Sequence, residues 1–275
     1  MSPLWRDQLR IVLSPRQLLL LRLKRGLHPR VAAKNVIPCE CPPGAPAWDA
    51  ALKVFAASAE KPEWREADAM VVLSNHFARY LLTPWSDDLS DDREHVEFAR
   101  HGFSRIYGQS AEQWEVRLAL DEVGATHVAC AVDRQLIGSI REITQKNRLR
   151  LISIQPYLMA AFNQWRDRFR EGSRWFVLAE HGRICIALLE HGRWRWLRCQ
   201  RLPDETRPEL PVLLEREEHM ADAHGVSRTL LLHAPEWGTV PAIEGWTVQR
   251  LVLPAQEGFS ASTDAAFSMA IHGAG

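Results

Sequence analysis

The hydrophobic pattern of this 275-residue chain repeats once, and this repeat limits the folds that the chain can adopt. Each half begins with three short apolar segments joined by turn-forming residues, followed by an amphipathic helix and a further apolar segment. The pattern predicts an antiparallel meander with tight hairpins, covered by a helix. The predicted meander strands are 9–13, 18–24 and 28–37 in the first half, and 175–179, 184–189 and 194–202 in the second.

Strands and helices continue beyond each meander. Further strands are expected at 69–73, 78–82, 114–120, 127–132, 149–154, 229–233 and 247–253. Helices are expected from Trp48 to Ala59, behind Ser90-Asp91-Asp92, behind Asp133, from Pro156, through Leu213 to Met220, and behind Thr263-Asp264. Acidic and hydroxyl residues at a helix start accept hydrogen bonds from its first N–H groups. We therefore expect Asp91, Asp133 and Asp264 to act as helix caps.

Two halves with the order β-β-β-α-β-α-β-α predict mixed sheets covered by helices. This order is the one found in ribonuclease-H-like and actin-like folds, which normally hold a nucleotide between two halves. We predict an α/β protein with a duplicated ribonuclease-H-like (actin-like ATPase) fold, in which helices flank two mixed-sheet halves. The first half would cover residues 1–172, with a small subdomain inserted at about 70–132, and the second would cover 173–275.

Composition excludes several classes of function. Lys plus Arg and Asp plus Glu both number 34, so the net charge is zero, and a dedicated nucleic-acid binder would show a basic excess. The cysteines number five, an odd count without a C-x-x-C pair, which favours a reducing compartment. The densest apolar run, 18–23, is too short to span a bilayer. We expect a cytoplasmic chain without direct membrane insertion, attached to a membrane only through a partner.

One segment narrows the family. Residues 69–85, AMVVLSNHFARYLLTPW, look like the strand, turn, strand and Leu-x-Pro segment of actin-like pilus assembly proteins. These are the PilM-type proteins, the cytoplasmic domain of the type II secretion L component and the MSHA-pilus I protein. The N-terminal meander, the Glu180 region and the closing helix from Asp264 to His272 fall at the corresponding places in that family. The resemblance covers nearly the whole chain in the order of elements.

The resemblance implies a nucleotide site built from two hairpin turns, usually with Asp and Gly, and a glycine-rich adenosine loop. Glycine lets backbone N–H groups approach a phosphate, and a carboxylate holds Mg²⁺. Here the first turn, Leu13-Ser14-Pro15-Arg16, has neither Asp nor Gly, while the second, Glu180-His181-Gly182, keeps one acid and one Gly. The third position, 232–236, lacks the glycine pair. The cleft-equivalent residues are Ser14, Arg16, Glu180, His181, Gly182 and His233, with no catalytic residue, metal site or cofactor assigned.

The resemblance therefore implies a cytoplasmic scaffold of a type IV pilus or type II secretion-like assembly platform, degenerate for nucleotide. Its expected partners are the cytoplasmic tail of a PilN-like single-span inner-membrane protein and the assembly ATPase. The alternative is an active, ATP-binding actin-like ATPase or kinase relative. A ribonuclease-H-like nuclease is a weaker third reading, because it needs converging acids at strand ends, and the strands end in Leu13, Ala179 and His233.

The 11 tryptophans separate into groups. Trp48 and Trp165 lie on apolar helix faces and are expected in the core. Trp194 and Trp196 alternate with Arg195, which predicts two indoles on one face of a strand. The loop tryptophans are candidates for partner binding, because loop aromatics are enriched at interfaces: Trp85, Trp237 and Trp246.

The histidines give weaker signals. Two Glu-His-Gly-Arg turns, at 180–183 and 190–193, would lie at opposite ends of one strand, so their histidines are not expected to share a ligand. His219 and His224 are five residues apart, a spacing that does not place two ligands on one helix face. Ser74-Asn75-His76 is expected to be a turn.

Overall fold

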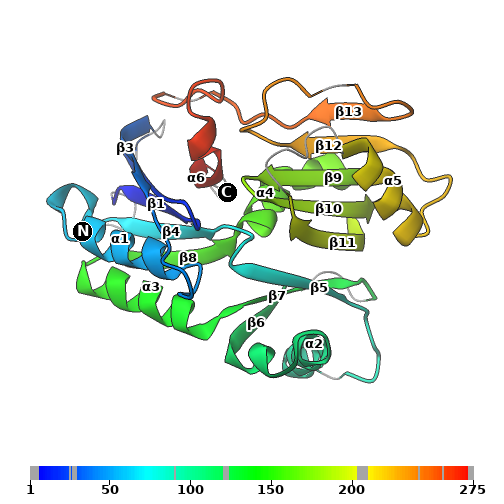
Figure 1. Ribbon diagram of the computed structural model, residues 1–275, viewed down its shortest axis with the longest axis horizontal. Coiled ribbons are helices and arrows are strands. Elements are labelled where there is room, and N and C mark those ends of the chain that lie inside the picture. Colours follow the sequence, from blue (N-terminus) through cyan, green and yellow to red (C-terminus); the bar gives the residue numbers. More distant parts are fainter. Residues whose placement is uncertain are drawn as a thin grey trace. The chain divides into compact units, whose positions relative to one another are not determined.

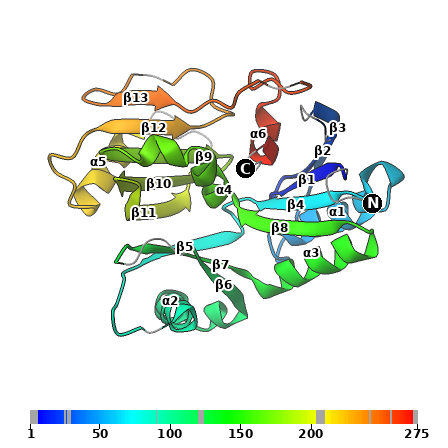
Figure 2. The same cartoon turned by 180° about the vertical axis from the view of Figure 1, so that it is seen from behind.

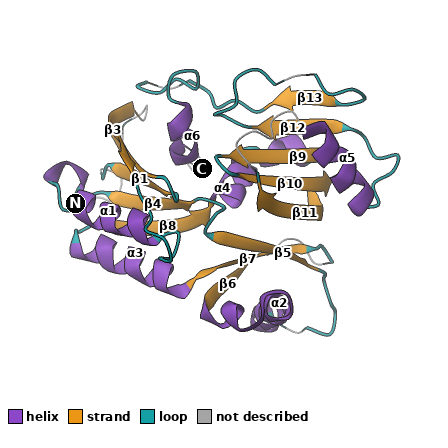
Figure 3. Cartoon of the chain, viewed as in Figure 1, coloured by secondary structure: helices purple, strands orange, loops and turns teal. Residues whose placement is uncertain are grey.

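The computed structural model describes residues 6–24, 26, 30–89, 91–119, 124–202, 210–240, 242–255 and 257–271. Its strands are β1 (Gln8–Leu13), β2 (Gln17–Lys24), β3 (Arg30–Pro38), β4 (Asp68–Leu73), β5 (Ala78–Thr83), β6 (Trp114–Ala119), β7 (His127–Asp133), β8 (Arg150–Pro156), β9 (Ser173–Glu180), β10 (Arg183–Glu190), β11 (Arg193–Arg201), β12 (Thr229–His233) and β13 (Thr247–Arg250). Its α-helices are α1 (Asp49–Ala59), α2 (Asp92–Tyr107), α3 (Arg134–Lys146), α4 (Tyr157–Gln164), α5 (Leu210–Met220) and α6 (Ser268–Ile271). Figure 3 distinguishes the strands from the helices by colour.

The elements follow the predicted order, with ends shifted by a few residues. In addition to the predicted elements, short 3₁₀ turns are present at Pro62–Trp64, Gly108–Gln113, Arg166–Phe169 and Ala265–Phe267. Parts of three predictions, at residues 28–29, Ser90 and residue 120, lie outside the described residues, as does His272.

The chain forms two compact units. The first comprises Met1–Ala78, Val132–Gln164 and Leu253–Gly275, and the second comprises Arg79–Ala131 and Trp165–Val252. Each unit holds a five-stranded mixed sheet, in the order β3-β2-β1-β4-β8 in the first and β11-β10-β9-β12-β13 in the second. The labelled strands of the second sheet can be followed in this order in Figures 1 and 2. The predicted duplication is therefore present strand by strand.

Pairing within the two sheets is equivalent. In the first sheet β1 pairs antiparallel with β2 and parallel with β4, and in the second β9 pairs antiparallel with β10 and parallel with β12. Helices α1 and α3 pack on each other beside the first sheet, and α6 packs against β1 and β2 (Figure 1). Because α6 packs there, the closing segment from Leu253 belongs to the first unit.

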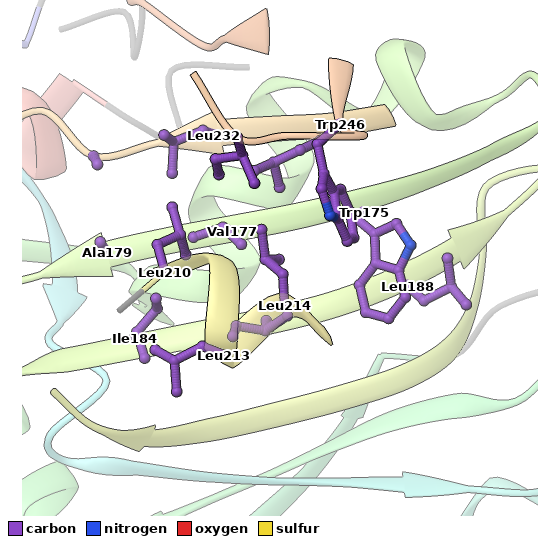
Figure 4. Close-up of a cluster of buried hydrophobic side chains, with 14 of the residues drawn as sticks. Trp175, Val177, Ala179, Ile184, Leu188, Leu210, Leu213, Leu214, Leu232 and Trp246 are labelled. Atoms are coloured by element: carbon purple, nitrogen blue, oxygen red, sulfur yellow. The ribbon is translucent and has the colours of Figure 1, made fainter. Parts of the chain in front are cut away.

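Two apolar clusters stand out among the described residues of the second unit. In the larger one, α5 lays Leu210, Leu213 and Leu214 over β9, β10 and β12, and Trp175 meets Trp246 edge to face (Figure 4). The smaller core lies between α2 and a three-stranded sheet of order β5-β7-β6, and its buried members are Ala99, Phe103, Ala111, Val116, Ala129 and Ala131. Helix α2 and most of this small sheet lie within Arg79–Ala131, which clusters with the second unit.

Two of the three predicted helix caps are confirmed. The Asp91 carboxylate accepts hydrogen bonds from the N–H groups of Arg93 and Glu94, and the Asp133 carboxylate accepts one from Gln135. The prediction for Asp264 is wrong, because its carboxylate caps no helix. It instead accepts hydrogen bonds from the Ser260 N–H at 3.1 Å and from Lys34 Nζ of β3 at 2.5 Å. The bond from Lys34 ties the closing segment to the first sheet.

Candidate functional site

The carboxyl ends of the central parallel strands carry polar residues in both sheets. In the first sheet, β1 and β4 end at the paired residues Leu13 and Leu73, and Ser14 and Ser74 follow. In the second sheet, β9 ends at Glu180 and its parallel neighbour β12 ends at His233. Open α/β sheets bind ligands outside the carboxyl ends of their strands. These two sheet edges are therefore the candidate sites, each within its own unit.

The turn after β1 uses its polar groups internally. The Ser14 hydroxyl donates to the carbonyl oxygen of Gln17 at 2.8 Å and accepts from the Gln17 N–H at 3.2 Å. The Ser14 N–H also donates to the Gln17 carbonyl, and Pro15 has no N–H. Arg16 is exposed, and its carbonyl accepts from the N–H of Cys39. The turn is thus closed on itself and offers little backbone to an anion.

Two buried polar residues that sequence reasoning assigned only to a turn lie at the same edge. Ser74 and Asn75 are fully buried behind β4, and the Ser74 N–H donates to the carbonyl of Leu13. The Asn75 amide oxygen accepts a hydrogen bond from the N–H of Leu158 at 3.1 Å, near the start of α4. Asn75 therefore fixes this helix to the end of β4. The signal that would have found these residues is a polar pair directly after an apolar strand.

The turn after β9 has a different character. Glu180 is buried, His181 is exposed, and Gly182 has a positive φ of 71°, a conformation that glycine adopts without steric cost. The Gly182 carbonyl accepts from the N–H of Leu202 just beyond β11. Burial, with the sulfurs of Cys130, Cys185 and Cys199 and the Glu180 carboxylate nearby, raises the pKa of Tyr80 well above its usual value. The Glu180 carboxylate therefore lies near Tyr80 and three cysteines, in largely apolar surroundings.

His233 is an interior residue. Its Nδ1 lies 2.9 Å from the carbonyl oxygen of Leu251, to which it donates, and its ring lies 4.4 Å from that of Trp165. Burial lowers the pKa of His233 to about 4, although the Leu251 hydrogen bond acts in the opposite direction. His233 is therefore neutral at physiological pH and oriented by the protein, so it supplies no positive charge to a ligand.

The tryptophan predictions have mixed outcomes. Trp48 and Trp165 are buried, as expected. The prediction that Trp194 and Trp196 share a face is wrong, because a bulge pairs Trp196 with Leu188 and Trp194 with the next residue, Leu189. Consecutive strand residues point to opposite faces. Trp196 accordingly packs on the larger core and donates its indole N–H to Glu217.

The three loop tryptophans differ in exposure. Trp85 is half-buried, stacks near His95 at 4.8 Å between ring centroids, and donates its indole N–H to Asp87. Trp237 packs only partly against the larger core. Trp246 is 9% exposed and is covered by Trp175 and the Arg228 guanidinium. Because Trp246 is a core residue, Trp85 and Trp237 are the loop tryptophans that have exposed surface for binding a partner.

The histidines singled out in the sequence lie in turns and near the end of α5. The two Glu-His-Gly-Arg turns lie at opposite ends of β10, as predicted. His219 and His224 have ring centroids 5.6 Å apart, although their spacing predicted no shared helix face, because α5 ends at Met220 and the chain turns back through Asp222. Even so, the described part of the chain holds no group of three or more His, Cys, Asp or Glu side chains placed to bind a metal ion.

No protein-family model matches the sequence, and no curated protein is significantly similar to it. Solved structures do match. The PilM-PilN type IV pilus biogenesis complex aligns with a TM-score of 0.58 at 15% identity, over 82% of this chain and 80% of that chain. The cytoplasmic domain of EpsL, an inner-membrane component of the type II secretion system of Vibrio cholerae, aligns with a TM-score of 0.57 at 11% identity, over 90% of each chain.

A third solved structure names the fold. A Bacteroides thetaiotaomicron protein described as having an actin-like ATPase fold and unknown function aligns with a TM-score of 0.57 at 11% identity, over 85% of this chain and 84% of that chain. The chain has the actin-like ATPase fold. Within this fold, Ser14 and Arg16 lie at the edge of the first sheet, and Glu180, His181, Gly182 and His233 lie at the edge of the second. Among the described helices, none has the length and apolar character that a membrane span requires.

Proposed function

We propose that the chain is a cytoplasmic scaffold in the assembly platform of a type IV pilus or type II secretion-like system. Its partner would be the cytoplasmic tail of a PilN-like single-span inner-membrane protein, with the assembly ATPase as a further partner. The observation that carries the proposal is likeness along nearly the whole chain to the PilM-PilN complex and to the EpsL cytoplasmic domain. The first is a type IV pilus biogenesis complex and the second is part of a type II secretion system, and both align over at least four-fifths of their length.

We further propose that the nucleotide site is degenerate. A phosphate needs several converging backbone N–H groups. The turn after β1 engages the N–H groups of Ser14 and Gln17 internally and contains Pro15. At the third position, His233 is neutral and bound to Leu251, and Trp237 donates its N–H to Ala234. These residues do not fit a bound nucleotide phosphate.

One observation favours the alternative of an ATP-binding protein. The turn after β9 keeps Glu180 beside Gly182, whose positive φ of 71° is a backbone conformation suited to close approach by a ligand. The test is thermal unfolding of the full chain with millimolar Mg-ATP, because a ligand that binds only the folded state raises Tm. We expect no shift. A shift that Glu180→Ala abolishes would overturn the degenerate site, and Glu190→Ala, in the turn of identical sequence at the other end of β10, is the matched control.

The partner is tested by binding. The probe is a synthetic peptide with the sequence of the cytoplasmic tail of a PilN-like single-span membrane protein, titrated by calorimetry against the purified full chain. We expect binding that Trp85→Ala or Trp237→Ala weakens about tenfold, as for an interface aromatic worth about 1.4 kcal/mol. Ile152→Ala, which removes an exposed apolar side chain from β8, should bind unchanged. No binding by the wild-type chain would overturn the proposal.

A further inference from the structure

Two cysteines face each other across neighbouring strands. Cys185 of β10 and Cys199 of β11 are direct antiparallel partners, and both are free thiols with their sulfurs 2.8 Å apart. Directly opposed residues in antiparallel strands have Cα atoms about 4.5–5.5 Å apart. A disulfide requires about 4.4–6.8 Å. The backbone at this pair therefore already allows a covalent bond.

The two thiols differ in access to solvent. Cys185 is buried on β10, between β11 and β9, while Cys199 is half-buried on β11, the edge strand of this sheet. Arg79 lies close enough to Cys199 for the guanidinium and the sulfur to interact electrostatically, and Arg183 and Arg201 lie near Arg79. Reactive thiols typically occupy such positively charged, partly exposed surroundings. Cys199 is thus the thiol that a small oxidant can reach.

The other cysteines are less suited than Cys199 to react first with an oxidant. Burial raises the pKa of Cys130 to about 12, and burial together with Cys199 raises the pKa of Cys185 well above its usual value. Both groups are therefore thiols at neutral pH and do not start an exchange reaction. The sulfurs of Cys39 and Cys41 contact carbonyl oxygens of their own segment, at Ile37 and Pro46 respectively.

We propose that Cys185 and Cys199 are a reversible disulfide-forming pair, oxidised by low-molecular-weight disulfides of the glutathione type. The Cys199 thiolate attacks one sulfur of the small disulfide, forming a mixed disulfide and releasing the first small thiol. Cys185 then attacks the Cys199 sulfur and passes its proton to the departing second small thiol. Two protein thiols are oxidised to one disulfide while one small disulfide is reduced to two thiols.

Proximity drives the second step. The Cys185 sulfur is already in contact with the Cys199 sulfur, so intramolecular attack replaces an encounter in solution. A disulfide in a reducing compartment is typically transient and responds to redox state. The bond would join the edge strand β11 covalently to its neighbour β10.

The test is a count of free thiols. The reduced full chain is equilibrated anaerobically in buffers of increasing oxidised-to-reduced glutathione ratio, quenched in acid, alkylated and analysed by intact and peptide mass. We expect the five alkylatable thiols to fall to three, with one linked peptide pair joining Cys185 to Cys199. Cys41→Ser should form the same link, and Cys199→Ser should not form it.

Thermal unfolding gives a second readout. The oxidised wild-type chain should melt several degrees above the reduced chain, because the cross-link restricts the unfolded state. Cys199→Ser should melt at the same temperature in both buffers. Five alkylatable thiols in every buffer, a stable glutathione adduct on Cys199 without the link, or a link through Cys39, Cys41 or Cys130 would each overturn the proposal.

Discussion

The imidazole of His233 packs against the indole of Trp165, with the two ring centroids 4.4 Å apart. This contact and the hydrogen bond to Leu251 fill the space around a histidine that sequence reasoning placed at a ligand-binding edge. The residue is therefore held neutral by its surroundings, and the consequence can be measured as a pH dependence of stability.

His233 should make the protein less stable in mild acid. Its pKa is about 4 in the folded chain and 6.5 when unperturbed. Below pH 6.5 the unfolded chain binds a proton that the folded chain does not, so the free energy of unfolding falls as the pH drops toward 4. The total loss is about 3 kcal/mol. His233→Gln should flatten this part of the curve of Tm against pH, and His181→Gln, at an exposed histidine, should not. Equal slopes in wild type and His233→Gln would refute the assignment.

The carboxylate of Asp68 is buried, and Arg150 binds it. Arg150 of β8 donates two hydrogen bonds to it, at 2.9 and 2.6 Å, and the Asp68 side chain is only 2% exposed. Arg150→Ala should remove both of these charge-assisted hydrogen bonds from a buried carboxylate and lower the free energy of unfolding by about 1.5–3 kcal/mol. Asp68→Ala should cost less, because the Arg150 side chain already reaches solvent.

A neighbouring ion pair supplies the control for that prediction. Arg148 and Glu66 lie 3.7 Å apart with both side chains mostly exposed, so Arg148→Ala should change stability by less than about 0.5 kcal/mol. Chemical denaturation of the three variants measures the difference. Similar losses for Arg148→Ala and Arg150→Ala would contradict the role of burial.

Gly258 should not tolerate a side chain. It has a φ of 82°, and a Cβ built there would lie 2.8 Å from the Cβ and 3.0 Å from the carbonyl oxygen of Val31 in β3. Gly258→Ala therefore combines an unfavourable backbone conformation with a clash. Gly44 has nearly the same φ, 84°, with nothing near its Cβ position. Gly44→Ala should cost about 1 kcal/mol and Gly258→Ala clearly more. Equal changes in Tm would show that the contact with Val31 is relieved at no cost.

Two cross-strand pairs between β10 and β11 should respond oppositely to charge reversal. Arg183 faces Arg201 at one end of the strands, and Glu190 faces Arg193 at the other. Like charges directly opposite each other destabilise a sheet, and opposite charges stabilise it by about 0.2–1 kcal/mol. Arg201→Glu should raise Tm and Arg193→Glu should lower it. Shifts of the same sign would show that general net charge, and not the facing pair, controls stability.

Most of the architecture follows from local patterns. The hydrophobic period and turn residues predicted the order of strands and helices, and Asp91 and Asp133 cap helices because capping involves only neighbouring N–H groups. The candidate site was predicted less completely. Buried Ser74 and Asn75 were assigned only to a turn, because their roles depend on Leu13 and Leu158, which are distant in sequence.

The two Glu-His-Gly-Arg turns show which features local sequence determines and which depend on tertiary contacts. Their sequence alone specifies a hairpin, and a hairpin forms in both places. Their backbones differ: only Gly182 has a positive φ in the first turn, whereas both His191 and Gly192 do in the second. In the first turn the Gly182 carbonyl accepts a hydrogen bond from Leu202, and in the second the His191 N–H donates one to Gly172.

The sequence by itself thus determined which elements form, in what order, and where the chain reverses. The tertiary structure decided that Trp246 is a core residue, that a bulge separates Trp194 from Trp196, and that Asp264 binds Lys34. The physical reason is range. Periodicity, caps and turns involve residues a few positions apart, whereas burial and side-chain pairing depend on strands and helices brought together from distant parts of the chain.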